Sequence, residues 1–434
     1  MEPVTVGIIC LCLFFLFIFI GMPIGFAFLT IGFFGFVLVR TFDSACYLLG
    51  SVPYTWGSTY QMVVIPLFIL MGQFAFQSGI SKDLYESAYK WVGGKPGGIA
   101  LATTVACTLF AACTGSSLAS AATMGTIAMP EMKKFKYSMR LATGCVAAGG
   151  TLGILIPPSV VFIVYGFLTG SSIGKLFIAG IIPGILIALI FLTLIYVRCR
   201  INPDIGPRGP SSTWKEKIRS LLGVWGMLAL FILIIGGLYL GVFTPSEAGA
   251  IGASGAFIIM VFKGRLTWLG LSSSLVGTIK TTAMIFMILI GAQVFNGFLT
   301  LSGIPAMIAA AMGNLPVPNH VVLIIILLVY IPLGMMMDGL PMILLTLPTL
   351  FPIVVDLGFD PIWFGVLTCV MCELSNITPP MGMNLYIIKG VSGGQVSIQE
   401  VIMGAIPFSI ALLICLAILV TVPQISLFLP GLMG

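Results

Sequence analysis

Charged residues are scarce in this chain: they make up only 7% of its 434 residues, and there is a single histidine. An ordinary soluble domain carries roughly 25% charged residues. Hydrophobic residues account for 59% of the sequence and gather in long runs. This composition excludes a soluble globular protein and predicts an all-α, multi-pass membrane protein. The formal net charge of +6 is explained by loop topology rather than by nucleic acid, because the basic residues lie between apolar runs.

The groups that hydrolytic enzymes need are also missing. The one histidine, His320, lies at the edge of an apolar run, so an HExxH metal motif is impossible, and no phosphate-binding loop is present. The ten cysteines lie mostly within apolar runs, which is typical of small buried side chains rather than of a disulfide framework. We therefore expect a non-enzyme that uses neither a nucleotide nor a transition metal.

Apolar runs place the predicted membrane segments along the chain. The first run follows Glu2 instead of a positive start, so we expect a retained helix rather than a signal peptide. The segments lie at about 4–39, 58–78, 97–130, 139–170, 174–197, 219–242, 247–263, 268–300, 320–355, 361–391 and 397–422.

Two of these segments, 97–130 and 320–355, exceed the roughly 20 residues that one crossing needs. Each has a polar, glycine-containing centre, at 114–117 and 337–339. The pattern predicts two re-entrant hairpins whose tips lie inside the membrane.

Paired prolines interrupt two other segments, at Pro157-Pro158 and Pro379-Pro380. Proline removes a backbone donor and breaks the helix, and in lipid such a break is tolerated only where it lines a cavity or binds something. The two pairs lie 222 positions apart, and the same shift superposes Pro130 on Pro352 and Ser116 on Asp338. A hairpin followed by a broken helix therefore recurs, which indicates an internal repeat.

Flanking charge orients the two repeats. Lysines and an arginine surround the first hairpin, whereas His320, Asp356 and Asp360 surround the second. Because cytoplasmic loops are rich in Lys and Arg, the hairpins should enter from opposite faces. The sequence thus predicts two inverted repeats whose breaks meet near the bilayer midplane.

The breaks and tips supply oxygen ligands suited to sodium. Carbonyl and hydroxyl oxygens match hard cations, and helix N-termini favour an anionic substrate group. The first candidate site comprises Gly115, Ser116, Ser117, Gly153, Ile156, Pro157, Pro158 and Ser159. The second comprises Asp338, Gly339, Asn376, Thr378, Pro379, Met381 and Gly382. Candidates for facing the substrate are Ser116, Asn376 and Asn384.

Alternatives stay open at several of these positions. A proline often only kinks a membrane helix, and small residues often only allow close packing. Asp338 could bind a cation, couple protons or cap its helix. Glu373 is either a site residue or a support, because an ionisable group inside an apolar run is expensive. Residues Arg140, Lys175, Lys280 and Lys389 fit interfacial anchors better than substrate ligands.

Three motifs carry a family resemblance. TGSSLASAATMGTIAMP (114–130), GGTLGILIPPS (149–159) and SNITPPMGMNLY (375–386) resemble the large membrane subunit of tripartite ATP-independent periplasmic (TRAP) transporters, the DctM family. The resemblance implies an elevator-type sodium symporter in the bacterial inner membrane. It also implies a small four-helix membrane subunit and a periplasmic binding protein as partners, and an organic acid as substrate: a C4-dicarboxylate, a sialic acid or another sugar acid.

The same resemblance implies a division into scaffold and transport regions. Scaffold helices are expected at 1–80 and, after a cytoplasmic loop, within 198–300. Transport regions are expected at 81–197 and 301–395, followed by a C-terminal helix at 396–434. A channel is the weaker reading, because inverted repeats within one chain suit alternating access. The serious rival is a self-contained anion symporter or antiporter that is coupled to Na⁺ or H⁺.

Overall fold

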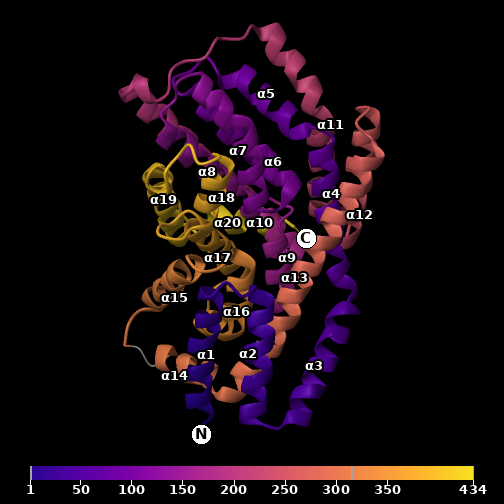
Figure 1. Ribbon diagram of the computed structural model, residues 1–434, viewed down its shortest axis with the longest axis vertical. Helices are drawn as coiled ribbons and strands as arrows, with labels where there is room; N and C mark the ends of the chain where they lie inside the picture. The colour runs from indigo at the N-terminus through magenta and orange to yellow at the C-terminus, as the bar shows by residue number, and fades with distance from the viewer. Residues whose placement is uncertain (1, 314–315, 434) are drawn as a thin grey trace.

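The described chain is helical throughout. The computed structural model describes residues 2–313 and 316–433, and within these ranges it contains helices and turns but no β-strand. Eight helical segments of the described chain are long and apolar enough to cross a bilayer. Helices suit lipid because each one pairs its own backbone N–H and C=O groups. The predicted all-α membrane fold is confirmed (Figure 1).

The helices of the first half lead from the N-terminus to the middle of the chain. They are α1 (Pro3–Phe19), α2 (Ile24–Val39), α3 (Phe42–Gly57), α4 (Val64–Gln77), α5 (Ile80–Val92), α6 (Gly98–Thr114), α7 (Ser117–Lys134), α8 (Met139–Leu155), α9 (Val160–Thr169) and α10 (Ile173–Ile201).

The second half repeats this order. Its helices are α11 (Trp214–Tyr239), α12 (Pro245–Phe262), α13 (Trp268–Ser302), α14 (Ile304–Gly313), α15 (Asn319–Gly334), α16 (Gly339–Asp356), α17 (Pro361–Asn376), α18 (Met383–Val391), α19 (Ile398–Thr421) and α20 (Gln424–Gly431). Capping boxes begin three of them, with Thr213, Thr244 and Ser397 each paired to a glutamate three residues later.

The repeat extends over nearly the whole chain. The 222-residue shift brings the start of α7 onto the start of α16 and the start of α8 onto the start of α17. It also brings α2 onto α12, α5 onto α14, α9 onto α18 and α10 onto α19. The single long helix α13 corresponds to α3 and α4 together, which are separate helices in the first half.

Packing between the halves is reciprocal. Helix α2 packs on α13, and its counterpart α12 packs on α4, which is the counterpart of part of α13. In the same way α16 packs on α9 while α7 packs on α18, and α8 packs on α19 while α17 packs on α10. Such exchanged pairs are what an approximate two-fold axis between the halves produces. The hairpins α6–α7 and α15–α16 lie on opposite sides of the middle of Figure 1.

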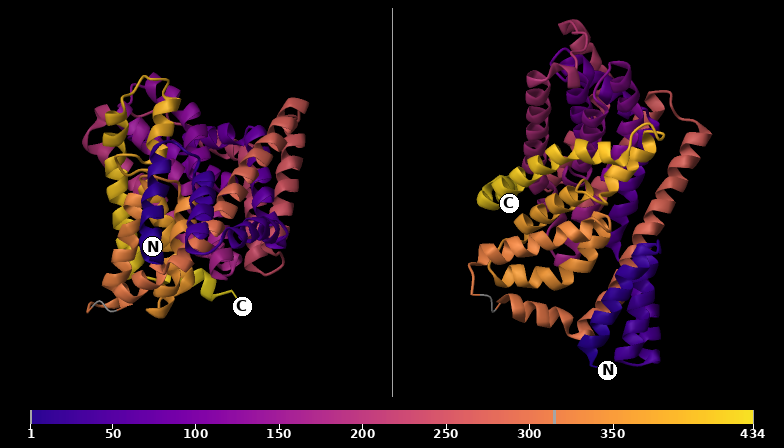
Figure 2. Two further views of the ribbon diagram at one scale, coloured as in Figure 1. Left: turned by 60° about the horizontal axis from the view of Figure 1, so that its bottom comes forward. Right: turned by 60° about the vertical axis from the view of Figure 1, so that its left-hand side comes forward.

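A wall of long helices lies beside the hairpins. Helices α2 and α4 pack along α13, and α12 packs on α4. Figure 2 shows the indigo N-terminal helices joined to the salmon-coloured α13 along one side of the molecule in its right-hand view. The hairpins and broken helices form the rest of the molecule. The wall faces the hairpin tips, because residues of both line the same cavity.

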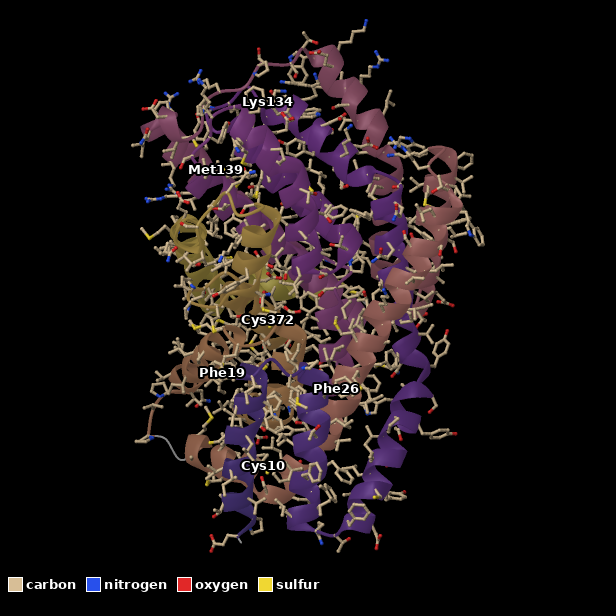
Figure 3. All side chains as sticks on the ribbon, viewed as in Figure 1. Cys10, Phe19, Phe26, Lys134, Met139 and Cys372 are labelled. Atoms are coloured by element: carbon tan, nitrogen blue, oxygen red, sulfur yellow. The ribbon has the colours of Figure 1, made fainter. Side chains whose placement is uncertain are left out.

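The base of the first hairpin is tied to the loop between the repeats. The Tyr137 hydroxyl donates to the carbonyl oxygen of Pro207 at 2.6 Å and accepts from the amide of Ile99 at 3.1 Å. The amide of Gly97 donates to the carbonyl oxygen of Gly206 at 3.0 Å. The basic end of this hairpin, marked by Lys134 in Figure 3, lies at the edge of the molecule, whereas Cys372 lies near its middle.

The N-terminal segment differs from the sequence prediction. The predicted segment 4–39 is two helices, because the chain turns at residues 20–23, where Gly21 has φ 92° and Pro23 precedes α2. Residues 42–57 form α3, a helix that lies outside every segment that the sequence predicts. Asp43 and Pro53 lower the apolar character of that stretch, so hydropathy does not predict a helix there. The short helices α5, α14 and α20 were also not predicted.

Candidate cation and substrate site

The first hairpin turns at Gly115 and contacts the first helix break there. Gly115 has φ 59°, in the left-handed region, and ends α6. A Cβ at Gly115 would lie 2.7 Å from the carbonyl oxygen of Pro158, closer than side chains pack. Ser116 then caps α7, accepting from the amide of Ala119 at 3.4 Å. Only glycine allows both this turn and this approach.

The first break is buried on all sides. Helix α8 ends at Leu155 and α9 begins at Val160, so the backbone of residues 156–159 leaves the helical hydrogen-bond pattern. A Cβ at Gly153 would lie 2.6 Å from the carbonyl oxygen of Ser116, so the hairpin tip lies directly on the end of α8. Ser159 caps α9 and is fully buried. The contacts of Gly115 with Pro158 and of Gly153 with Ser116 therefore bring the hairpin tip and the first break together, as predicted. The Pro157-Pro158 bond in this break is cis.

Asn376 joins the two hairpin tips. Its amide nitrogen donates to Ser117 Oγ at 3.3 Å and to Asp338 Oδ1 at 3.4 Å. Asp338 holds the N-cap position of α16 without a capping hydrogen bond of standard geometry, although its carboxylate interacts with the amide of Gly339. Cation binding, proton coupling and helix capping therefore all stay open for Asp338.

The second break resembles the first but is more exposed. Helix α17 ends at Asn376 and α18 begins at Met383, and the Pro379-Pro380 bond is cis, as in the first break. Gly382 lies against the backbone of Asn376, where a Cβ would meet the carbonyl oxygen at 2.6 Å. Thr378 donates its hydroxyl to the carbonyl oxygen of Leu374. Met381 is 43% exposed.

Two further polar residues that the sequence singled out contact α8. Glu373 is 1% exposed, and its Oε1 accepts from the amide of Ile154 at 3.2 Å. Asn384 is fully buried and donates to the carbonyl oxygen of Ala147 at 3.2 Å. Of the three substrate-facing candidates, only Ser116 lines the cavity described next. Asn384 lies in helix packing, and Asn376 lies beside Ser117 and Asp338, which do line it.

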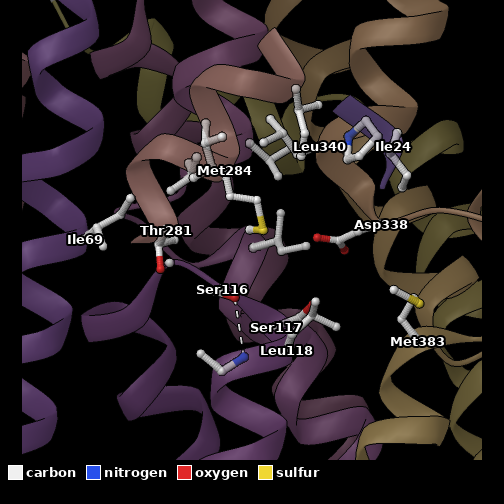
Figure 4. Close-up of a pocket in the computed structure, with 18 of the residues that line it drawn as sticks. Ile24, Ile69, Ser116, Ser117, Leu118, Thr281, Met284, Asp338, Leu340 and Met383 are labelled. Carbon is white, nitrogen blue, oxygen red and sulfur yellow. Dashed lines mark hydrogen bonds between the residues drawn. The ribbon is translucent and has the colours of Figure 1, made fainter. Parts of the chain in front are cut away.

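A cavity of about 960 Å³ lies between the hairpin tips and the helix wall (Figure 4). Ser116, Ser117 and Asp338 line it from the tips, with Thr281 and Met284 of α13 across from them. The wall also contributes the turn between α1 and α2 and part of α4, including Gly21, Met22, Pro23, Ile24, Ile69 and Gln73. Sequence reasoning missed this wall; Gln73 and Thr281, polar residues inside apolar runs, were its available signal.

The chemistry of the tips fits a hard cation. Asp338 is the one charged side chain among the described residues that line the cavity. Asn376 Oδ1 is buried and has no hydrogen-bond partner in the described chain. Within the described ranges, no group of three His, Cys, Asp or Glu side chains could hold a metal ion. The donors at the tips are carboxylate, amide, hydroxyl and carbonyl oxygens. These ligands suit Na⁺ better than a transition metal.

The letters Gly390-Val391-Ser392-Gly393-Gly394 match the spacing of a nucleophile elbow. They follow the end of helix α18, whereas an elbow requires a strand before the serine. The Ser392 hydroxyl donates to the carbonyl oxygen of Lys389 at 2.6 Å, so its proton is bonded to the backbone and not to a side-chain base. This serine closes a helix end and is not a nucleophile.

Two repeats, each with a hairpin tip resting on a helix break, and a cavity between them define a membrane transporter of the inverted-repeat class. A family model for the tripartite ATP-independent periplasmic transporter, DctM component, matches residues 11–425. The chain belongs to this family of large permease subunits and is not an enzyme.

Several relatives extend over most of the chain. It is 38% identical to the C4-dicarboxylate TRAP transporter large permease protein DctM of Pseudomonas aeruginosa, covering 86% of this chain and 87% of that protein. It is 33% identical to the 2,3-diketo-L-gulonate TRAP transporter large permease protein YiaN of Escherichia coli, covering 94% of each. It is 31% identical to the sialic acid TRAP transporter large permease protein SiaM of Vibrio cholerae, covering 95% of each.

The fold also matches a solved structure. The YdaH transporter of Alcanivorax borkumensis, described as having an unusual topology, aligns with a TM-score of 0.65 over 89% of this chain and 90% of that one. At 17% identity this likeness concerns the fold alone.

Proposed function

We propose that this permease takes up an organic acid anion by sodium-coupled alternating access, with a periplasmic binding protein delivering the substrate. The observation that carries the proposal is that both hairpin tips meet at Asn376, the last residue before the second helix break, and that both tips line the neighbouring cavity. Broken helices near the repeat interface are where secondary transporters of this architecture bind substrate and coupling ion.

Sodium coupling follows from the donor set. At the first site, the carbonyl oxygens of Ser116 and Pro158 approach the glycines opposite them. Ser116 and Ser117, which line the cavity, add hydroxyl groups. At the second site, the carboxylate of Asp338 and the backbone carbonyl oxygen of Asn376, which approaches Gly382, add an anionic and a neutral oxygen. Each set offers the oxygen ligands that a dehydrated Na⁺ requires, so we assign one ion to each site.

The charge of the cavity gives coupling a physical reason. Helices α7 and α16 begin at Ser117 and Gly339, so their positive N-terminal ends favour an anionic substrate. The Asp338 carboxylate opposes that preference, and the described cavity lining holds no basic side chain. Bound cations would remove this repulsion, so substrate binding should require sodium first.

An elevator motion is consistent with the wall of the cavity. The side chains that face the tips from α2, α4 and α13 are largely apolar, among them Ile24, Ile69 and Met284. A largely apolar surface allows the tips to slide past it once the buried hydrogen bond from Asn296 of α13 to the carbonyl oxygen of Leu344 in α16 is released. The tips themselves are held together by Asn376. We therefore assign α6–α9 and α15–α18 to the moving part and α1–α4 and α11–α13 to the scaffold.

The names of the relatives support a class of substrate. Named large permeases of this family carry a C4-dicarboxylate, 2,3-diketo-L-gulonate or sialic acid. We propose a small carboxylate or sugar acid for this chain as well. A small four-helix membrane subunit and a secreted binding protein would complete the transporter in the bacterial inner membrane.

Reconstitution tests the function directly. The permease, its small subunit and its binding protein would be placed in liposomes, and uptake of labelled carboxylates and sugar acids measured with and without an inward sodium gradient. We expect uptake that needs both the gradient and the binding protein. Uptake that ignores sodium, or proceeds without the binding protein, contradicts the proposal and favours a self-contained anion transporter.

The role of Asn376 can be tested against a matched asparagine. Asn376→Ala removes the amide that holds Ser117 and Asp338 together, and a hydrogen bond to a charged group contributes about 1.5–3 kcal/mol. We expect the sodium concentration for half-maximal uptake to rise at least about tenfold, since each factor of ten corresponds to about 1.4 kcal/mol. Asn319→Ala, which removes an exposed amide bond to Leu357, should leave it unchanged. Equal sodium dependence in both variants removes the assignment.

A further inference from the structure

Helix α17 carries a polar pair that points into the first repeat. Glu373 and Asn376 are three residues apart and therefore lie on the same face of the helix. Glu373 contacts the amide of Ile154, near the end of α8, and Asn376 contacts Ser117 at the first hairpin tip. These two contact points adjoin, because α8 and the tip touch at Gly153. The polar face of α17 thus covers one spot at the seam between the repeats.

This seam is not symmetric. The repeat shift places Glu373 on Thr151, Asn376 on Ile154 and Asp338 on Ser116. The second repeat therefore has two carboxylates where the first has two hydroxyls. Thr151 satisfies its own hydroxyl by donating to the carbonyl oxygen of Ala148 at 2.6 Å. A cation at the second hairpin tip balances the charge of Asp338. The charge of Glu373 has no counterpart in the first repeat and is left unbalanced.

Two oxygens at the seam have no partner. Within the described chain, Glu373 Oε2 and Asn376 Oδ1 are buried and accept no hydrogen bond. The ion pairs of the described residues are Lys82–Glu86, Lys90–Glu216 and Lys263–Asp83, and none involves Glu373. A buried carboxylate without a counter-charge is strongly unfavourable, so Glu373 must either take up a proton or bind a cation.

We propose that Glu373 Oε2 and Asn376 Oδ1 bind a further monovalent cation at the seam, separate from the ions at the two hairpin tips. The site rests on the proposed sodium coupling and adds an ion that the repeat symmetry does not predict. Bound there, the cation neutralises Glu373 and draws α17 toward the first repeat through the same two side chains that already contact it. The seam ion therefore makes the two broken helices one rigid unit.

Counting bound sodium tests the site without a substrate. The purified chain in lipid nanodiscs would be titrated with radioactive ²²Na⁺, with choline keeping the ionic strength constant. We expect Glu373→Gln, which keeps the shape and removes the charge, to bind about one ion fewer per chain than the unaltered protein. Thr151→Val, the change at the repeat-equivalent position, should bind the full number. Unfolding temperatures in choline alone check that each variant is folded.

The outcomes separate this proposal from the proposed function. An unaltered chain that binds no sodium overturns the sodium coupling itself. An unaltered chain that binds sodium, together with a Glu373→Gln variant that binds the same number, overturns only the seam site and assigns a proton to Glu373 instead. If Glu373→Gln does not fold, Glu373→Asp supplies the test, because a shortened carboxylate should weaken one binding event and leave the others unchanged.

Discussion

At the scale of single residues, Gly115 has the most demanding position at the site. It combines a left-handed backbone with direct contact to the carbonyl oxygen of Pro158. Gly115→Ala meets two penalties: about 1–2 kcal/mol for placing a Cβ in the left-handed region, and a clash that pushes the tip off the break. We expect the variant to lose both stability and sodium-dependent uptake, measured by thermal unfolding and by the liposome assay.

Gly170 supplies the matched control for that substitution. It has φ 68° at the end of α9, and a Cβ there would meet no atom within 4 Å. Gly170→Ala should therefore show the conformational penalty alone, with uptake retained in the molecules that fold. If both variants lose uptake to the same degree, the contact with Pro158 has no special role in transport.

At the scale of elements, the joint between the repeats is held by Tyr137. Its buried hydroxyl satisfies the amide of Ile99 and the carbonyl oxygen of Pro207 at once. Tyr137→Phe leaves both groups unpaired, which costs about 1–3 kcal/mol for each group that water cannot reach. We expect a lower unfolding temperature with the sodium dependence of uptake unchanged, because the joint lies at the hairpin base and not at its tip.

The exposed tyrosine Tyr47 provides the comparison. It is 79% exposed on α3, so Tyr47→Phe removes a hydroxyl that faces the surroundings of the protein. Its unfolding temperature should match that of the unaltered chain. A Tyr137→Phe variant as stable as Tyr47→Phe would show that the loop is held by its other contacts.

The elements differ in how well the sequence predicted them. Both hairpins were predicted correctly, because excess length and a glycine such as Gly115 leave few other ways to place the chain in lipid. Helix α3 was missed because Asp43 and Pro53 interrupt its apolar pattern. Segment length and proline therefore predict folding back more reliably than hydropathy predicts a partly polar helix.

The site was predicted in outline but not in its contacts. Paired prolines located both breaks, yet no pattern shows that Asn376 reaches across to Ser117. The cavity wall was missed because Met284 lies in an uninterrupted apolar run, where a residue that faces a cavity looks like one that faces lipid. Long-range pairing depends on packing between repeats, and spacing within one repeat does not contain that information.

At the scale of the whole molecule, the two repeats have unequal exposure at equivalent positions. Ser159 of the first break is fully buried, whereas Met381, its counterpart after the repeat shift, is 43% exposed. In a protein with two-fold related repeats, the opposite state of alternating access arises when one part moves as a rigid body against the other, so that the two repeats exchange surroundings. The exposed break should therefore become buried and the buried break exposed as transport proceeds.

Thiol labelling measures this exchange. In a background without the exposed native cysteines Cys12 and Cys46, Ser159→Cys and Met381→Cys would be treated with a membrane-impermeant reagent, applied to one side at a time. We expect Met381→Cys to react from one side in the resting protein, while Ser159→Cys is protected. Sodium and substrate together should slow the first reaction and allow the second from the opposite side. Because each repeat serves as the other's control, a change at only one break would indicate a local gate, and no change at either would exclude an exchange of surroundings.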